Sequence, residues 1–461
     1  MALTESRNMT LTDHSSGPGV EQFVSVAETM KPTLSMKGTA TPRVVIIGGG
    51  FAGLNAAKGL ADAPVTVTMI DRRNHHVFAP LLYQVATAQL SPANIARPIR
   101  GILRGQKNVR VILGEVEKID IEGQRVVVSD GLTIDYDFLI VAVGATHSYF
   151  GHDEWASLAP GLKTIEDALE IRRRILIAFE RAEREDDPAK RAALLSFIVI
   201  GGGPTGVEMA GAIGEIANHS LAKDFKTIDP RQAKVLLLEG LPRILPMFAE
   251  KLSARAEKDL KRFGVVTRTN SLVTAIDENG VNIGDERIEA ATVIWAAGVQ
   301  VSPLTRALEE IAELDRAGRV PVERALHVAR HPELFVIGDA SSVRNAEGKP
   351  LPGVAPVALQ EGQWAAANIA RAANGEPYEP FDYKDRGSMA TIGRNQAVAE
   401  IKGFKFAGFP AWLAWVVVHV LFMVGLRNRL LVIAQWVFSY LTYNRGARLI
   451  TGELTVKDSS P

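Results

Sequence analysis

The stretch Val44-Val45-Ile46-Ile47-Gly48-Gly49-Gly50-Phe51-Ala52-Gly53 decides the fold, because a β-branched run here leads straight into a glycine-rich turn. In this G-x-G-x-x-G pattern Gly48 permits the tight bend, Gly50 lets the backbone approach a pyrophosphate, and Gly53 lets the next helix pack closely on the strand. The first N–H groups and the positive dipole of that helix meet the phosphates. The stretch therefore predicts a Rossmann-like dinucleotide site, against the alternative of a plain glycine-rich turn.

An acidic residue follows this turn at the distance that a dinucleotide site needs. Residues 65–70 form the next apolar strand and end at Asp71, where a carboxylate is expected to bind an adenosine ribose. A fingerprint alone is weak, but here strand, helix and terminal acid occur together. We therefore predict a first nucleotide site formed by Gly48, Gly50, Gly53 and Asp71.

The same pattern recurs later in the chain. Residues 197–200 lead into a second turn, whose glycines are Gly201, Gly203 and Gly206. The next apolar strand after this turn ends at Glu239, which is later than usual for such a site. We therefore expect a second nucleotide site, with a helical insertion over residues 216–232.

Three more strands that end in glycine indicate which nucleotide each site binds. Residues 334–337 are followed by Gly338 and Asp339, a pattern similar to the second flavin signature of two-dinucleotide oxidoreductases, whose aspartate binds the ribityl chain. The strands that end at Gly144 and Gly298 resemble the crossover segments between flavin and nicotinamide domains of such chains. This order of signals places FAD on the first fingerprint and NADH on the second.

The acid of the second fingerprint indicates the nicotinamide cofactor. Glu239 favours NADH, because a carboxylate repels the 2′-phosphate of NADPH. Arg243 lies close enough in the sequence to leave NADPH open as an alternative.

Composition excludes several chemistries. With 461 residues, of which 47% are hydrophobic, the chain is long enough for two or three domains, and its formal net charge of zero gives no reason to expect nucleic acid. Because the chain has no cysteine, disulfide reduction, sulfenic-acid peroxidase chemistry and sulfide oxidation through a redox thiol are excluded. No cluster of His, Asp and Glu has metal-ligand spacing, so we expect no metal, and electrons must pass through flavin alone.

The C-terminal part of the chain is much more apolar than the rest. Residues 409–426 form an apolar stretch with one histidine, and residues 430–443 form a shorter one. We favour a helical hairpin lying in one leaflet of a membrane, while a pair of core or dimer-interface helices and a shallow membrane span stay open. The side chains expected at headgroup depth or against anionic lipid are Trp412, Trp415, Trp436, Tyr440, Tyr443, Arg427, Arg429, Arg445 and Arg448.

These signals together predict an α/β protein with two Rossmann-like dinucleotide-binding domains, the flavin domain being interrupted by the nicotinamide domain, and a membrane-associated helical segment at the C-terminus. The leader carries no secretory or transit signal, so we expect the protein on the cytoplasmic face of the cell membrane, peripheral or monotopic. The expected boundaries are a leader at 1–42, FAD domain at 43–155, NADH-binding domain at 156–320, FAD domain again at 321–400 and membrane-anchoring helices at 401–461.

Beyond the fingerprints, further stretches resemble the type II NADH dehydrogenases, the non-pumping NADH:quinone oxidoreductases. They are Asn74-His75-His76-Val77-Phe78-Ala79-Pro80-Leu81-Leu82-Tyr83-Gln84-Val85-Ala86, GGGPTGVE from Gly201, Arg243-Ile244-Leu245-Pro246 and Arg386-Gly387-Ser388-Met389-Ala390-Thr391-Ile392-Gly393. The resemblance covers nearly everything after residue 42. It implies a membrane quinone, ubiquinone or menaquinone, as the electron acceptor.

The resemblance also implies roles for individual residues. It places Glu208 near the nicotinamide and flavin rings, and Tyr83 and Gln84 in the lining of the flavin pocket. The quinone motif of the family, Ala-Gln-x-x-x-Gln, falls on residues 355–360. Here Pro356 stands in place of the first glutamine and Gln360 matches the second, so Gln360 is the expected acceptor-side residue.

The expected reaction is hydride transfer from NADH to FAD, followed by transfer of two electrons and two protons to quinone. With no other redox centre, we expect no proton pumping. The expected partners are the quinone and the lipid bilayer surface, and the C-terminal helices also offer a surface for a homodimer. Two other functions stay open, a soluble NAD(P)H-dependent flavin reductase for a ferredoxin-like protein and an NADH- and FAD-binding sensor similar to apoptosis-inducing factor.

Overall fold

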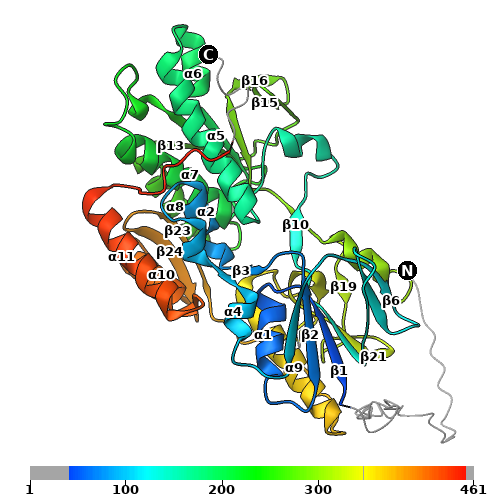
Figure 1. Ribbon diagram of the computed structural model, residues 1–461. Coiled ribbons are helices and arrows are strands. Elements are labelled where there is room, and N and C mark those ends of the chain that lie inside the picture. The colour runs from blue at the N-terminus through cyan, green and yellow to red at the C-terminus, as the bar shows by residue number, and fades with distance from the viewer. Residues whose placement is uncertain (1–40, 346, 453–461) are drawn as a thin grey trace, which may run out of the picture.

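The computed structural model describes residues 41–345 and 347–452, so the expected leader lies almost entirely outside the described residues. A six-stranded sheet with strand order β20-β21-β9-β1-β2-β5 forms one unit of the molecule (Figure 1). All its neighbours pair in parallel except β20 with β21. Its strands are β1 (Arg43–Ile47), β2 (Thr66–Asp71), β5 (Val109–Leu113), β9 (Phe138–Val141), β20 (His327–Val328) and β21 (His331–Val336).

Two helices cover this sheet at its flavin-signature strands. They are α1 (Phe51–Gly59), which follows the first glycine turn, and α9 (Ala355–Ala373), and they lie side by side (Figure 1). The two helices approach so closely that a Cβ on Gly362 would collide with the carbonyl oxygen of Ala52. This contact brings residues more than 300 positions apart into one site.

A second, four-stranded sheet with order β13-β12-β11-β17 is parallel throughout. Its strands are β11 (Ser196–Ile200), β12 (Lys234–Leu238), β13 (Val265–Arg268) and β17 (Thr292–Trp295). The helices packed around it include α5 (Ile165–Arg184), α6 (Pro188–Leu194), α7 (Pro204–Glu215) and α8 (Glu250–Arg262). The prediction of two Rossmann-like units is therefore confirmed.

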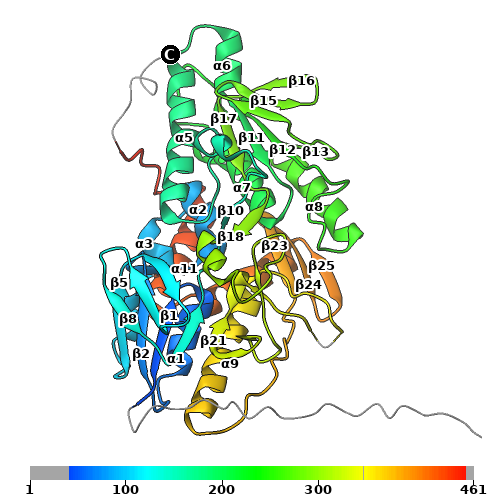
Figure 2. The same ribbon diagram turned by 90° about the vertical axis from the view of Figure 1, so that its right-hand side faces the viewer.

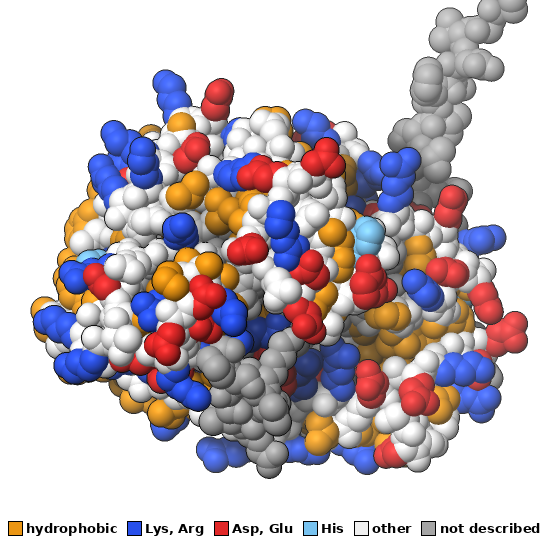
Figure 3. Space-filling model, turned by 90° about the horizontal axis from the view of Figure 1, so that it is seen from above, with side chains coloured by type: hydrophobic (Ala, Val, Ile, Leu, Met, Phe, Trp, Pro, Cys, Tyr) orange, Lys and Arg blue, Asp and Glu red, His pale blue; other side chains and the backbone are white. Residues whose placement is uncertain are grey.

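Basic and acidic side chains alternate over the end of the molecule formed by α5 and α6 (Figure 3).

The predicted helical insertion over 216–232 is wrong for most of its length. After α7 the helix continues only as one π-helical turn, Ile216–Ser220, and a short 3₁₀ turn follows at Pro230–Gln232. Between them the Glu183 carboxylate of α5 accepts hydrogen bonds from the backbone N–H groups of residues 226–228. Because these N–H groups are bound by a side chain, they do not form helical bonds.

The chain passes between the two units through two short paired strands. Directly after Gly144 it forms β10 (Ala145–His147), and directly after Gly298 it forms β18 (Val299–Val301). These two strands pair antiparallel and lie between the two units (Figure 2). The two glycine-terminated segments are thus joined to each other as well as to their sheets.

Short strands and helices complete the two units. The strands are β3 (His75–Val77) with β4 (Ala96–Pro98), the meander β6 (Val116–Asp120), β7 (Arg125–Val128) and β8 (Thr133–Asp135), a second meander β14 (Ala275–Asp277), β15 (Gly280–Ile283) and β16 (Glu286–Glu289), and β19 (Val320–Pro321) with β22 (Ser341–Ser342). The short helices are α2 (Leu82–Ala86), α3 (Pro92–Ile95) and α4 (Ile99–Leu103).

The C-terminal segment is a three-stranded antiparallel sheet followed by two helices. The strands are β23 (Ser388–Gly393), β24 (Gln396–Ile401) and β25 (Phe404–Ala407), and the helices are α10 (Phe409–Phe422) and α11 (Leu426–Thr442) (Figure 1). The apolar stretch 409–426 is therefore not one helix. Arg429 donates to the carbonyl oxygens of Leu421 and Met423 and so caps the end of α10. Within residues 41–345 and 347–452, no helix is both long and apolar enough to cross a membrane.

Candidate active site

The first glycine turn has the geometry that a phosphate site requires. Gly48 has φ +101°, a left-handed conformation that favours glycine, and its N–H donates to the carbonyl of Ile70 at 2.8 Å. A Cβ on Gly53 would collide with the carbonyl oxygen of Gly48, whereas a Cβ on Gly50 would meet nothing within 4 Å. The turn is therefore tight at its first and third glycines and open at the second, where a pyrophosphate fits.

The second turn repeats this geometry. Gly201 has φ +108°, and its N–H donates to the carbonyl of Leu238 at 2.7 Å. A Cβ on Gly206 would collide with the carbonyl oxygen of Gly201, and Gly203 is open like Gly50. The internal repeat that the sequence suggests thus extends to the hydrogen bonds of the turn.

The two predicted ribose acids occupy equivalent positions. Asp71 accepts hydrogen bonds from the N–H groups of Gly49 (2.5 Å) and Arg73 (2.7 Å). Glu239 accepts them from the N–H groups of Gly202 (2.5 Å) and Leu241 (2.8 Å). Each carboxylate is therefore held at the end of its strand, beside the glycine turn, where a ribose would lie.

Arg243, the residue that left NADPH open, is bound elsewhere. Its guanidinium donates to the carbonyl oxygens of Phe248 (2.7 Å) and Pro246 (2.6 Å) and to the hydroxyl of Ser253 (2.9 Å). These bonds hold Arg243 between its own loop and α8, and none of them involves Glu239.

One large cleft, with a volume of about 1040 Å³, brings most of the predicted residues together. Its lining includes Gly48, Gly50, Asp71, Gly144, Gly298, Gly338, Asp339, Tyr83 and Glu208. The adjacent second-fingerprint residues Gly201, Gly203, Gly206 and Glu239 lie outside this lining. The open position at Gly50 and the position of Asp339 in the same cleft fit an extended FAD, and Gly298 lies where the two nucleotides would meet.

A buried carboxylate that the sequence did not single out supports the flavin signature. Glu361 is fully buried and accepts hydrogen bonds from the Gly338 N–H (2.5 Å) and the Ser341 hydroxyl (3.2 Å). Burial raises the pKa of Glu361 to about 8. Glu361 thereby fixes the backbone that carries Asp339.

Glu208 lies at the junction of two cavities. It lines the large cleft together with Tyr83 and Trp295, and it also lines a small cavity of about 70 Å³ beneath α10 and α11. Burial raises the pKa of Glu208 to about 8, and the carboxyl accepts a hydrogen bond from the backbone of Thr391. At neutral pH the side chain is therefore a neutral acid that can hold a proton at the cleft.

Gln84 lies behind Tyr83 and not in the cleft lining. Its amide donates to the Tyr83 hydroxyl at 2.8 Å and accepts from the indole N–H of Trp436 at 2.7 Å. Gln84 lines the small cavity beneath α10 and α11. The expectation that Gln84 lines the flavin pocket is therefore wrong, because Trp436 from the C-terminal helix occupies its acceptor.

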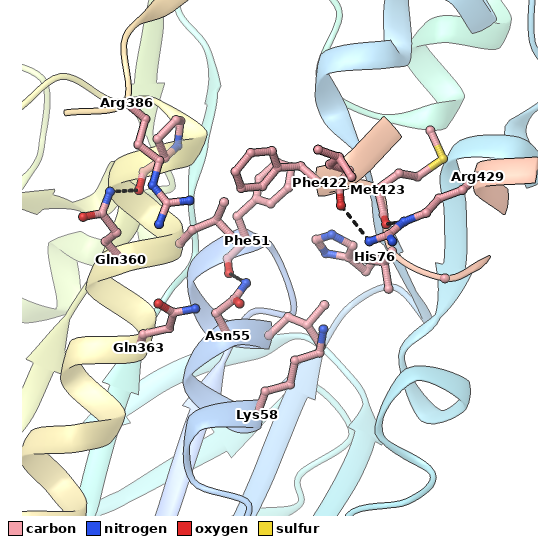
Figure 4. Close-up of a pocket in the computed structure, with 16 residues that line it drawn as sticks. Phe51, Asn55, Lys58, His76, Gln360, Gln363, Arg386, Phe422, Met423 and Arg429 are labelled. Atoms are coloured by element: carbon pink, nitrogen blue, oxygen red, sulfur yellow. Dashed lines mark hydrogen bonds between the residues drawn. The ribbon is translucent and has the colours of Figure 1, made fainter. Parts of the chain in front are cut away.

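A second cavity, of about 320 Å³, contains the predicted quinone residues (Figure 4). Pro356 and Gln360 line it from the first turns of α9, opposite the turn between α10 and α11. The Gln360 amide donates to the carbonyl of Lys384 and accepts from its N–H, both at 3.0 Å. Gln360 thus holds the Lys384 backbone at the cavity wall with both of its polar atoms.

The two cavities share a wall that sequence reasoning missed. Phe51 and His76 line both the large cleft and the second cavity. The His76 ring donates to the carbonyl of Gly49 at 3.0 Å, and burial lowers its pKa. The His-His pair at 75–76, just after Asp71, was the available signal. His419 of α10 is a third missed residue, stacked on Trp415 and edge-on to Phe78, and burial lowers its pKa to about 4.

Five of the nine side chains predicted to face lipid are held by contacts within the protein, whereas Tyr440 and Tyr443 are exposed, as that prediction requires. Trp415 is buried and Trp436 is bonded to Gln84. Arg445 is buried against Glu215, Arg448 pairs with Asp224, and Arg429 caps α10. Of the four arginines only Arg427 is exposed without such a bond among the described residues. For the five held side chains the prediction was wrong, because the pattern of aromatic and basic residues in a sequence does not reveal buried partners.

The exposed face of the C-terminal helices is instead apolar. On each helix, exposed side chains recur at intervals of three or four residues, as on one face of a helix. They are Phe409, Leu413, Val417 and Leu421 on α10, and Leu426, Leu430, Ile433, Val437 and Leu441 on α11.

Residues 42–362 match the family of pyridine nucleotide-disulphide oxidoreductases, and residues 386–443 match the NDH2 C-terminal domain. The chain is 48% identical over 427 residues to the type II NADH:quinone oxidoreductase NdhA of Mycobacterium tuberculosis, covering 89% of this chain and 90% of that protein. It is 31% identical over 380 residues to a type II NADH:quinone oxidoreductase of Staphylococcus aureus, covering 80% and 92%. The solved structure of NDH2 from Plasmodium falciparum in complex with NADH has the same fold, with a TM-score of 0.80 at 20% identity over 90% of this chain and 100% of that one.

Proposed function

Because the chain belongs to the type II NADH:quinone oxidoreductase family, which passes two electrons from NADH through FAD to a quinone without pumping protons, we propose which of its residues carry out each part of this reaction. The observation that carries the proposal is the repeated turn with an open central glycine, once at Gly50 and once at Gly203. The ferredoxin-reductase and sensor alternatives are not favoured by this family membership.

The first turn binds the FAD pyrophosphate, and Asp71, Gly338 and Asp339 contact its ribose and ribityl groups. Bound FAD supplies the two-electron chemistry, accepting a hydride from NADH and reducing the quinone. Gly203 and the N-terminus of α7 bind the NADH pyrophosphate. Glu239 binds the adenosine ribose, and its negative charge disfavours NADPH.

Glu208 serves as an acid at the meeting point of the rings. Its pKa of about 8 keeps the carboxyl protonated at neutral pH, so it adds no negative charge beside the reduced cofactor.

The quinone head group occupies the inner end of the second cavity, against Phe51 and His76. This wall separates it from the large cleft by one layer of side chains. Pro356 offers no side-chain amide here, and Gln360 acts by holding Lys384 at the cavity wall. The head group is therefore oriented chiefly by apolar and aromatic contacts.

The apolar face of α10 and α11 lies on the surface of a bilayer, with the remainder of the protein in the cytoplasm. Its exposed leucines reach 70% exposure at Leu426 and 74% at Leu441, and α10 contains no Asp, Glu, Lys or Arg. Such an exposed apolar face favours burial in lipid. A homodimer that covers the same face in detergent-free solution would contradict this assignment.

The assignment of the two nucleotides is tested with Gly50→Val and Gly203→Val. Both positions are open and extended, so the valine enters the space of the phosphate without disturbing the fold. We expect G50V to purify without flavin. We expect G203V to retain FAD with its normal absorbance while its KM for NADH rises at least tenfold. Loss of flavin in G203V with retention in G50V would reverse the assignment, and flavin that NADH reduces but quinone does not reoxidise would refute the quinone role.

A further inference from the structure

The outer end of the second cavity is lined by cations without acidic partners. Of the 16 residues that line the cavity, none is Asp or Glu, whereas Lys58, Arg386 and Arg429 are all present. Figure 4 shows Lys58 and Arg386 extending into the cavity from opposite sides, with Arg429 across from them. Lys58 lies two helical turns along α1 from Phe51, and therefore away from the proposed quinone wall.

A fourth cation lies next to this group without lining the cavity itself. Arg97 of β4 places its guanidinium against Gly425, in the turn that lines the cavity. Burial lowers the pKa of Lys58, and repulsion by Arg97 lowers it further. Within the described residues, no carboxylate forms an ion pair with Lys58, Arg97 or Arg386. Like charges held close together repel one another, and an anion bound between them removes that repulsion.

The position of the cations indicates what the anion is attached to. Leu421 and Phe422 line the cavity and are also exposed, and Leu421 belongs to the apolar face of α10. The next exposed leucine, Leu426, begins the apolar face of α11. A ligand with its anionic group among the cations would thus extend acyl chains directly onto the proposed membrane face.

We propose that Lys58, Arg97 and Arg386 form a binding site for the phosphate headgroup of an anionic phospholipid at the outer end of the quinone cavity. The Gln363 amide, which lines the same end, adds a hydrogen-bond donor for the phosphodiester. Arg429 stays bound to the end of α10 and contributes charge only. This inference rests on the proposed membrane face, because the acyl chains need that surface.

The test compares vesicle binding of the FAD-loaded wild type, Lys58→Gln/Arg97→Gln and a control, Arg184→Gln/Lys190→Gln. The control removes the same charge from exposed positions on the end of the molecule with mixed charges, at α5 and α6 (Figure 3). We expect wild type to prefer phosphatidylglycerol over phosphatidylcholine vesicles. The cavity variant should lose this preference by about five-fold per charge removed, or about 25-fold in all, and the control should keep it.

Native mass spectrometry in detergent distinguishes a site from general attraction. Wild type and the charge-conserving Lys58→Arg/Arg97→Lys should retain one phosphatidylglycerol, and Lys58→Gln/Arg97→Gln should not. An unchanged lipid preference in the cavity variant, or an equal loss in the control, would overturn the site. Displacement of the lipid by millimolar inorganic phosphate would assign the site to a soluble anion instead. Wild type that binds neither kind of vesicle would refute the membrane face itself, whereas equal binding to both kinds would refute only the headgroup site.

Discussion

Replacing Arg445 by alanine should release the C-terminal tail from the body of the protein. Arg445 is 3% exposed, and its guanidinium donates to Glu215 at 2.6 Å and to the carbonyl of Thr87 at 2.8 Å. Glu215, 15% exposed, would be left without its cation. Removing one member of a buried ion pair costs about 3–5 kcal/mol, because the remaining charge is uncompensated. We expect a loss of this size in the free energy that holds the tail against α7.

Two variants separate the ion pair from simple packing. Glu215→Gln/Arg445→Met leaves no unpaired charge, so we expect it to lie within about 1 kcal/mol of wild type. Arg427→Ala, at an exposed position in the first turn of α11, should change stability by less than about 0.5 kcal/mol. Urea unfolding of the flavin-loaded protein and hydrogen exchange over residues 426–448 would report global and local opening. A loss below about 1 kcal/mol in R445A, or a double variant as unstable as R445A, would refute the reasoning.

Three further predictions concern Glu208 and Glu239. Glu208, with its pKa raised to about 8, should produce a transition in NADH:quinone turnover near that pH, which Glu208→Gln should abolish; a transition that persists in the variant would contradict the role. The pKa of Glu208 in the folded state lies above the unfolded value of about 4.5, so between these two values the folded state binds one more proton than the unfolded state. The contribution of Glu208 to the free energy of unfolding therefore decreases as pH rises through that window. Urea unfolding at several pH values should show this decrease in wild type and a smaller decrease in Glu208→Gln. Glu239→Gln should lower the ratio of kcat/KM for NADH to that for NADPH by about tenfold, since the charge that repels the 2′-phosphate is removed; initial rates measure this, and an unchanged ratio would assign the preference elsewhere.

Features with a local physical cause could be predicted from the sequence. The glycine turns, the strands before them and the acids after them follow from what a tight turn and a phosphate need within one βαβ unit. The conformation of the segment after α7 could not be predicted, because Glu183 from a different helix binds its backbone N–H groups. The partner of an arginine such as Arg445 lies 230 residues away, and no periodicity encodes such a contact.

In the candidate site, too, some residues could be predicted from the sequence and others could not. Asp71, Gly338 and Asp339 reach one cleft as expected, since the strand ends of a parallel sheet meet at one edge, and Glu208 reaches the same cleft from α7 of the other unit. The second cavity depends on α10 and α11 folding back over α1, which apolar composition alone does not determine. Its cations, Lys58 and Arg97, were therefore not foreseen.

The way the two units are attached limits how they can move. The paired strands β10 and β18 form one connection between the units, and a unit held by these strands alone could still rotate about them. The tail makes a second attachment on the other side of the molecule, where Arg445 and Arg448 bind residues at the end of α7 and just beyond it (Figure 1). The packing of α2 against α5 adds a further contact between the units, so rotation about β10 and β18 is opposed. We therefore expect the hydride donor and its acceptor to be held on one rigid frame, so that turnover does not require closure of the domains.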